Sequence, residues 1–371
     1  MTSTARPSIR FGSRPDDLAA LFEHGGPFLT VYLTAEGAVE DAHRRNRLRW
    51  QALRDRLGDD QPSTRDVEAI VLETPLKGGG LVVIATERDV IHVERTETPP
   101  RSDLGRWAAL PSLIPLLAAR EALVSHVDVA IDRRGANISL DTGGDGIEQE
   151  IEGREQPIRK VKPGGWSQRR FQQRAENTWR DNAANVADAL ARLVDVHDPR
   201  VVFVSGDLRA IELLRKSLPQ RVLDRVQVLD GGERGHGPAD AELDAQMRRL
   251  LATIPAADTV ALLRDFEREV GQVDRAVNGP HDTVAALGRG QVEMLLVPDD
   301  PTDTRVAWFG RSPLAVALEP EVLRNEGVGD PVRGRLADVL VRAALGSGAG
   351  VRVVPKAGPV LEGAGAMLRW A

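Results

Sequence analysis

Hydrophobic and polar positions along the chain predict a mixed α/β protein, because runs with strand character alternate with runs of helical period. In residues 1–105 the segments PFLTVYLTAE, GGGLVVIAT and RDVIHVER have the length and β-branched content of strands. DDLAALFEHGG and STRDVEAIVLE are expected to form short helices. Residues 39–57 also have a helical period, with arginines on one face and apolar side chains on the other: Val39, Ala42, Trp50, Leu53 and Leu57.

The middle of the chain combines a hairpin with a long amphipathic helix. VSHVDVAIDRRGANISLDTG alternates and is expected to turn at Arg134-Gly135, whereas EIEGREQPIRKVKPGGWSQ lacks a period and is expected to be a loop. From Gln168 to about Val194 the period is helical, with Ser167 placed as the N-cap and His197-Asp198-Pro199 as the stop. A helix of about 27 residues is about 40 Å long.

The remaining sequence alternates helices and strands, as in other α/β proteins. RVVFVSGDLRAIELLRKSL has the pattern of a buried strand, a Ser-Gly turn and a helix. After residue 240, a helix pair or one kinked helix is followed by the strand-like runs VEMLLVPDD, RVAWFG and GVRVVP. The Pro-rich TETPPRSD and the Gly-rich LDGGERGHGPADAE interrupt the pattern. We therefore predict three domains, residues 1–105, 106–232 and 240–371.

The composition of the chain excludes several classes of protein. The 371 residues include no cysteine, which excludes disulfides, thiolate zinc sites and a cysteine nucleophile. The seven histidines have no metal-like spacing, so neither a metal nor another cofactor is expected. The N-terminus MTSTARPSIRFGSRPDD lacks the apolar core of a signal peptide, and no apolar run reaches the length of a membrane span. A cytoplasmic protein without a membrane partner is the expectation.

Positive charge gathers in one segment of this acidic chain, whose net charge is −6. Between residues 154 and 174 a single acid, Glu155, stands against seven cations: Arg154, Arg159, Lys160, Lys162, Arg169, Arg170 and Arg174. A phosphate backbone suits such a patch, because each neutralised phosphate releases counterions. A solvated surface loop is the alternative. The net negative charge of the whole chain does not favour binding of a polyanion, so any contact with nucleic acid must use a local patch of positive charge.

The same segment contains Gly164 and Gly165 directly before the predicted helix. Glycines allow backbone angles closed to other residues and let the main chain approach a ligand closely. The start of the helix offers unpaired N–H groups and a positive dipole end, which suit an anion or a developing oxyanion. Gln168 has no titratable group but can orient a water molecule and donate hydrogen bonds in an ester hydrolysis. Trp166 either stacks on a base or packs against its own domain.

Gly-Gly followed closely by Gln, on a basic loop before a long helix, resembles the peptide-releasing loop of archaeal and eukaryotic class-1 release factors. GPVLEGAGAMLRW looks like the C-terminal ending of release factors and Pelota, and GRGQVEMLLVPDD resembles a helix–glycine–strand segment of the same domain. Together these cover about two-thirds of the chain. The Gly-Gly-x-Ser-Gln form is that of the bacterial members of this family, whose relatives include peptidyl-tRNA hydrolases and Balon-type hibernation factors.

The resemblance implies a release-factor-like middle domain, with a long helix behind the Gly-Gly loop, and a Pelota/L7Ae-like α/β C-terminal domain. It implies an A-site factor that hydrolyses the peptidyl-tRNA ester in ribosome rescue. Gly164 and Gly165 match the paired glycines and Gln168 the glutamine, although Trp166 and Ser167 separate them, whereas the standard loop has none between. The expected partners are ribosomal RNA and peptidyl-tRNA, with an elongation-factor-type GTPase as a candidate. RNA-contacting residues are expected to be Arg159, Lys160, Lys162, Trp166, Arg169, Arg170 and Arg174.

Two alternatives remain open. A non-catalytic hibernation factor would occupy the A site of idle ribosomes, since some related factors have lost the motif. An unrelated α/β protein would use VVFVSGD as a phosphate-binding turn, although this segment lacks a Walker or dinucleotide fingerprint. The first region contains no Asn-Ile-Lys-Ser motif, so stop-codon reading is not expected.

Overall fold

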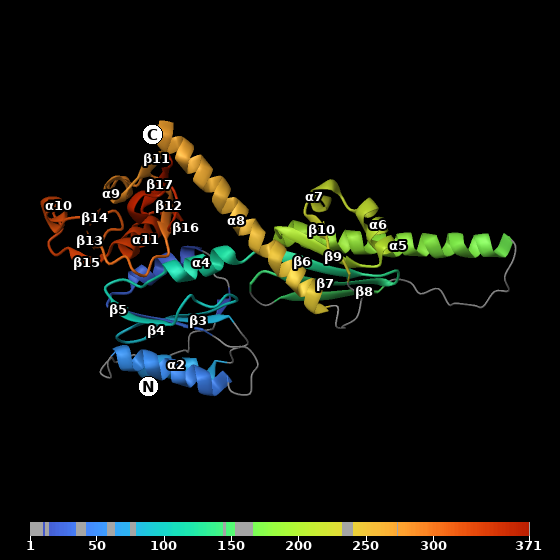
Figure 1. The fold of residues 1–371 in the computed structure, drawn as a ribbon, viewed down its shortest axis with the longest axis horizontal. Coiled ribbons are helices and arrows are strands. Elements are labelled where there is room, and N and C mark those ends of the chain that lie inside the picture. Colours follow the sequence, from blue (N-terminus) through green and yellow to red (C-terminus); the bar gives the residue numbers. More distant parts are fainter. Residues whose placement is uncertain are drawn as a thin grey trace. The chain divides into compact units, whose positions relative to one another are not determined.

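The chain forms two compact α/β units, which we call the composite unit and the middle unit (Figure 1). The composite unit contains residues 1–123 and 256–371, and the middle unit contains residues 124–255. The computed structural model describes residues 10–11, 15–34, 42–57, 64–74, 79–143, 146–152, 166–231, 240–272 and 274–370. The predicted α/β class is confirmed, while the division into three domains stays a prediction.

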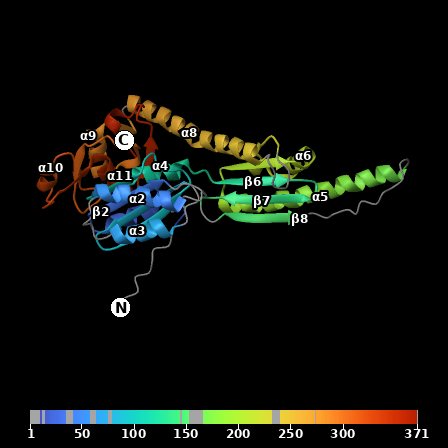
Figure 2. The ribbon, with the colours of Figure 1, turned by 60° about the horizontal axis from the view of Figure 1, so that its bottom comes forward.

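The N-terminal part of the composite unit is a five-stranded sheet with the order β1-β4-β3-β2-β5. Its strands are β1 (Arg10–Phe11), β2 (Phe28–Thr34), β3 (Gly80–Thr86), β4 (Val90–Thr96) and β5 (Leu104–Ala108). Helices α2 (Ala42–Leu57) and α3 (Thr64–Glu73) lie together over one face (Figure 2). Trp50 and Leu53 of α2 are buried there, as the predicted apolar face requires. The segment TETPPRSD, expected to be a linker, connects β4 to β5 within this sheet.

The C-terminal part of the composite unit contains two small sheets, with the orders β11-β17-β12-β16 and β14-β13-β15. Their strands are β11 (Ala276–Asn278), β12 (Val292–Pro298), β13 (Val306–Phe309), β14 (Val316–Ala317), β15 (Val332–Arg335), β16 (Gly350–Val354) and β17 (Gly365–Leu368). The helices are α9 (Pro280–Gly288), α10 (Pro320–Asn325), α11 (Leu336–Gly346) and the 3-10 turn η2 (Leu361–Gly363). Every residue of α11 from Leu336 to Leu345 is buried, so this helix is the centre of the unit.

The two ends of the chain share one hydrophobic core. Helices α1 (Pro15–Ala19) and α4 (Ile114–Ala122) and the 3-10 turn η1 (Ala20–Glu23) cover the second face of the N-terminal sheet. Leu18 and Phe28 belong to the same buried cluster as Leu340 and Ala343 of α11. The apolar surface of each part is thus buried by the other, which is the dominant favourable contribution to folding.

A buried polar cluster crosses this shared core. The Asp338 carboxylate of α11 is 2 % exposed and accepts hydrogen bonds from Arg106 of β5 and, at 3.3 Å, from the Ser112 hydroxyl. The Ser112 carbonyl accepts from the Tyr32 hydroxyl at 2.6 Å. Burial raises the pKa of Asp338, although Arg106 and Arg335 oppose that shift. The charge is therefore retained inside the core only with its partners in place.

The middle unit is a five-stranded sheet with the order β10-β9-β6-β7-β8, in which β6, β9 and β10 are parallel. Its strands are β6 (His126–Ile131), β7 (Gly135–Asp141), β8 (Ile147–Glu152), β9 (Val201–Gly206) and β10 (Val226–Val228). Helices α5 (Trp166–His197), α6 (Leu208–Ser217) and α7 (Gln220–Leu223) belong to this unit. The predicted hairpin is confirmed as β6 and β7. The sequence expectation of a loop from Glu150 onward is wrong for Glu150–Glu152, which complete β8.

The helix α8 (Asp240–Gln272) contributes to both units, with Pro255 inside it. Its first part packs Leu243, Met247 and Leu250 against Val201 and Phe203 of β9. Its second part buries Phe266 against β12 in the composite unit. The sequence left open a pair of helices or one kinked helix, and the structure has one helix. None of the helices in the described ranges combines the length and apolar composition that a membrane crossing requires.

The buried carboxylate of Asp338 yields a test of the shared core. We expect Arg106→Ala to lower the free energy of unfolding by about 3 kcal/mol, because it leaves a buried charge without its main partner. Urea unfolding of the full chain measures this. Arg101→Ala is the matched control: Arg101 also joins the two parts, pairing with Asp299 at 3.6 Å, but is 77 % exposed. The control should lose less than about 1 kcal/mol, and equal losses in both variants would contradict the assignment.

Candidate functional site

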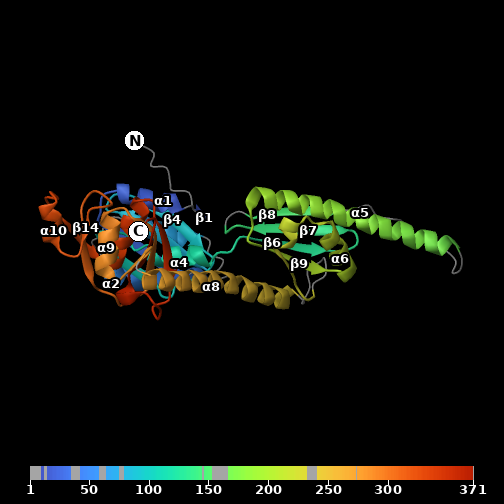
Figure 3. The same ribbon diagram turned by 90° about the horizontal axis from the view of Figure 1, so that it is seen from above.

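The long helix α5 is anchored to the sheet through only part of its length. Among its described side chains, which begin at Glu176, the first buried ones are Asn182 and Ala183. From there a buried stripe continues to Val194 and packs on the sheet. The backbone from Trp166 to Asn182 is about 24 Å of helix at 1.5 Å per residue. Figures 1 and 3 show this first part of α5 extending beyond the strands.

The residues predicted to form the site lie at or before the start of α5. Gly164, Gly165, Arg159, Lys160 and Lys162 lie outside the described residues. Five more are on the described backbone of α5, while their side chains are not described: Trp166, Gln168, Arg169, Arg170 and Arg174. Their assigned roles stay predictions.

The helix begins two residues earlier than the sequence pattern predicts. Ser167, expected as the N-cap, lies inside α5 because the helix begins at Trp166. Shifts of one or two residues at helix ends are common, since end residues have few fixed partners. Gln168 is consequently a residue of the first helical turn. The first four N–H groups of a helix have no acceptor within it, so unpaired donors lie in the turn that carries Gln168.

Arg133, in the turn between β6 and β7, holds α5 at the point where the buried stripe begins. Its guanidinium lies 4.7 Å from the ring centre of Trp179 and 3.2 Å from the Asp207 carboxylate. The Arg133 carbonyl accepts a hydrogen bond from the buried Asn182 amide at 3.1 Å. We call Arg133, Trp179, Asn182 and Asp207 the Arg133 clamp. It fixes the direction in which α5 leaves the sheet, because it contacts the helix on two successive turns.

The sequence did not single out the Arg133 clamp. Its members are far apart in the chain and come together only when β6 and β9 lie side by side as parallel strands. The only signal in the sequence is that polar residues follow two buried strands. Asp132, Arg133 and Arg134 follow β6, and Asp207 follows β9. Residues at the carboxyl ends of adjacent parallel strands meet at one sheet edge.

The segment VVFVSGD forms a strand, a turn and a helix as predicted, but it carries its own anion. The Asp207 carboxylate accepts a hydrogen bond from the Ala210 N–H at 3.0 Å and so caps α6. Burial opposes ionisation of Asp207, yet the hydrogen bonds from Ala210 and Arg133 hold its pKa below the ordinary value. Gly206 has φ +123°, and a Cβ there would lie 2.0 Å from the Ile131 oxygen. Close packing and a carboxylate cap therefore explain this turn, and no phosphate site is needed.

Acidic side chains line part of the sheet face that points away from α5 in the middle unit. Glu148, Glu150 and Glu152 alternate along β8 and are exposed. Burial raises the pKa of Asp128 on β6 to about 6, with Asp141 and Asp244 adding to the shift. The exposed glutamates of β8 give this edge of the sheet a negative charge, in contrast to the cation-rich residues 154–174. Within the described ranges no three His, Asp or Glu side chains come together as metal ligands would.

Comparison of the sequence with known proteins shows the family to which the chain belongs. The model of the bacterial archaeo-eukaryotic release factor family 2 matches residues 125–272, which span the middle unit and all of α8. The chain is also 32 % identical over 372 residues to the uncharacterized proteins Rv2629 and MT2704 of two Mycobacterium tuberculosis strains, covering 96 % of this chain and 97 % of each relative. The chain belongs to the bacterial archaeo-eukaryotic release factor family.

Three solved structures of translation factors align with nearly the whole chain, at low identity and low TM-score. An archaeal termination factor aRF1 has 16 % identity and a TM-score of 0.27, covering 98 % of this chain and 100 % of that one. Pelota of Archaeoglobus fulgidus has 13 % identity and a TM-score of 0.36, covering 98 % and 94 %. Dom34 of Saccharomyces cerevisiae has 11 % identity and a TM-score of 0.37, covering 97 % and 94 %. Because these TM-scores are below 0.5, family membership rests on the sequence matches.

The Arg133 clamp gives a prediction about the first part of α5. We expect Arg133→Ala to speed hydrogen exchange of the amides from Glu176 to Asn182 about 3-fold, because a stacking contact and a half-exposed ion pair are worth about 0.5–1 kcal/mol. Exchange followed by mass spectrometry measures this. Arg209→Ala removes an exposed ion pair to Glu212 on α6 and serves as the control. Unchanged exchange in Arg133→Ala would show that the clamp does not hold the helix.

Proposed function

We propose that this protein is a cytoplasmic A-site ribosome factor that hydrolyses the ester bond of peptidyl-tRNA in ribosome rescue. The observation that carries the proposal is the first turn of α5, which contains Gln168 and directly follows the paired glycines in the sequence. About 24 Å of helix separates that turn from the first buried side chains. Membership of the bacterial archaeo-eukaryotic release factor family supports the proposal.

The proposed chemistry needs no titrating side chain at the ester. Water attacks the carbonyl carbon of the peptidyl ester, and the bond to the ribose oxygen of the tRNA breaks, releasing a peptide acid and a free hydroxyl. Gln168 orients the attacking water, and the unpaired N–H groups at the helix start stabilise the developing oxyanion. Gly164 and Gly165 let the backbone approach the ester without a Cβ in the way.

RNA binding is assigned to the cations that flank the glycines. Arg159, Lys160 and Lys162 precede them, and Arg169, Arg170 and Arg174 follow on α5. Because 169, 170 and 174 fall within two helical turns, they present several cations along one short length of helix. Trp166 would stack on an unpaired base of ribosomal RNA or of the tRNA end. An elongation-factor-type GTPase remains a candidate delivery partner.

A non-catalytic hibernation factor is the second candidate, favoured by the position of Gln168. Trp166 and Ser167 occupy the first two helical positions, so Gln168 does not directly follow the glycines as it does in the standard loop. In this role the same cations hold the loop in the A site of an idle ribosome, and no ester is cleaved.

Substitution of Gln168 tests the catalytic proposal. We expect Gln168→Ala to slow release of a labelled peptide from peptidyl-tRNA on 70S or 50S particles by about 100-fold, the usual loss when one preorganised hydrogen-bonding group is removed. Gln172→Ala, one helical turn further along α5, is the matched control and should keep full activity. Release by Gln168→Ala at the wild-type rate would remove Gln168 from the mechanism.

The same ribosomes distinguish the two candidate functions. Co-sedimentation of an Arg169→Ala/Arg170→Ala variant should be weaker, and the slope of log affinity against log salt should fall by about 2, since two phosphate contacts are lost. Wild-type protein that binds in this way without releasing peptide would establish the hibernation role. Binding that is unaffected by the double substitution would exclude this cation pair as a ribosome contact.

A further inference from the structure

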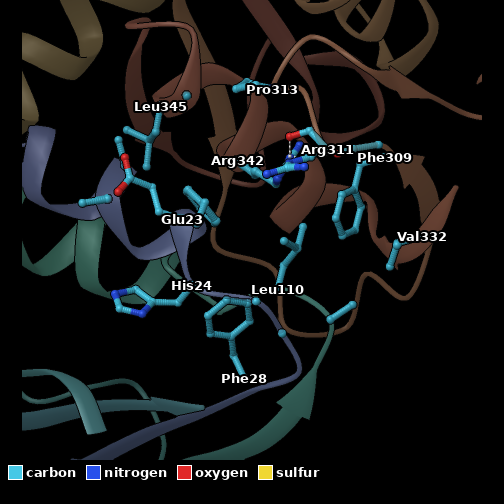
Figure 4. Close-up of a pocket in the computed structure, with 18 of the residues that line it drawn as sticks. Glu23, His24, Phe28, Leu110, Phe309, Arg311, Pro313, Val332, Arg342 and Leu345 are labelled. Atoms are coloured by element: carbon cyan, nitrogen blue, oxygen red, sulfur yellow. Dashed lines mark hydrogen bonds between the residues drawn. The ribbon is translucent and has the colours of Figure 1, made fainter. Parts of the chain in front are cut away.

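A pocket of about 860 Å³ in the composite unit has no part in the proposed hydrolysis. It lies between η1, with the turn that follows it, and the C-terminal part around β13 and α11 (Figure 4). Its volume falls within the range of about 300–1,000 Å³ of small-molecule sites. Apolar side chains from both ends of the chain line it: Phe22, Phe28, Leu110, Phe309, Val332 and Leu345.

A buried cation lines this pocket. Arg342 of α11 is 7 % exposed and donates hydrogen bonds to three carbonyl oxygens, those of Gly310 and Arg311 at 2.8 Å and that of Ser312 at 3.3 Å. Its guanidinium also lies 4.8 Å from the ring centre of Phe309 (Figure 4). Within the described residues no carboxylate lies within ion-pair distance of Arg342, and burial lowers its pKa. The positive charge of Arg342 is therefore balanced only by carbonyl dipoles and one aromatic ring. In a buried site of low dielectric, these compensate a full charge incompletely.

The charged groups at the rim limit what the pocket can accept. Glu23 and Asp330 line it and are exposed, as are Arg311 and His24. Water screens these exposed charges, whereas the buried Arg342 acts with little screening. The pocket thus favours one negative charge near Arg342, while the rim, with two carboxylates and one arginine, weakly disfavours a larger negative charge. The apolar side chains that line the rest of the pocket favour an anion that carries a hydrophobic body.

We propose that this pocket binds a small organic monoanion, an aromatic carboxylate, with its carboxylate at Arg342 and its ring among Phe22, Phe28 and Leu110. The carboxylate supplies the negative charge that Arg342 lacks, and the ring covers apolar surface of Phe22 and Val332 that water now reaches. Because both ends of the chain line the pocket, the ligand joins η1 to the C-terminal part. Occupancy stabilises the folded composite unit, as does any ligand that binds only the native state.

Phenylacetate is the probe for a test on the full chain, followed by ligand-detected NMR and thermal unfolding. We expect it to bind about 10-fold more tightly than the neutral phenylacetamide and the cationic phenethylamine, because only the anion compensates Arg342. Acetate, which has no ring, should bind weakly. Phenylacetate should also raise the unfolding temperature in proportion to its occupancy. Equal affinity for the anion and the amide, or no binding of phenylacetate at millimolar concentration, would overturn the proposal.

Three substitutions test whether phenylacetate binds in this pocket. Ala20→Trp fills the mouth at an exposed position of η1 and leaves Arg342 intact, so it should abolish phenylacetate binding without loss of fold. Arg342→Lys keeps the charge but loses the planar fork, and should weaken phenylacetate more than phenylacetamide. Arg324→Ala, an exposed arginine paired with Glu321 on α10 outside the pocket, is the control and should bind normally. Wild-type affinity in Ala20→Trp would show that the probe binds elsewhere.

Discussion

Packing of the second half of α5 against the middle-unit sheet is the interaction on which the candidate site depends. Val186, Leu190 and Val194 are buried in the core that α5 forms with β7, β8 and α6, and this stripe begins at Asn182. Before Asn182 the helix has little packing against the sheet, since its described side chains from Glu176 to Asp181 are exposed or half-buried. The segment QRRFQQRAEN is rich in good helix formers, which favours continuation of the helix without a packed face.

The hydrophobic anchor alone does not set the direction of the helix. A stripe of apolar side chains tolerates small rotations about the helix axis, because apolar contacts have no directional requirement. The Arg133 clamp adds directional contacts at the end of that stripe: a hydrogen bond to Asn182 and a planar contact with Trp179. The position of any chemistry at the first turn of α5 therefore depends on a turn between two strands about 24 Å away along the helix.

Local patterns in the sequence predicted the α/β class, the β6–β7 hairpin and most of α5, because periodicity and turn residues are local properties. They did not predict that Leu104–Ala108 pairs with β2, nor that Ile147–Glu152 is a strand. Glutamate is unfavourable in strands, and the alternation of Ile147 and Ile151 with polar residues is short. The Arg133 clamp was missed for a different reason: Arg133 and Asp207 meet only through the parallel pairing of β6 with β9.

The start of α5 at Trp166 changes what the Trp-Ser insert means for function. A glutamine that directly followed Gly165 would occupy the position of Trp166, whereas Gln168 lies about 3 Å further along the helix and about 200° around its axis. The proposed ester hydrolysis then requires either that a residue at this shifted helical position act on the ester, or that the first turn unwind on the ribosome. Unwinding costs little at a helix end, where the N–H groups lack intrahelical acceptors, so the two proposed functions differ in what they require of the first turn of α5.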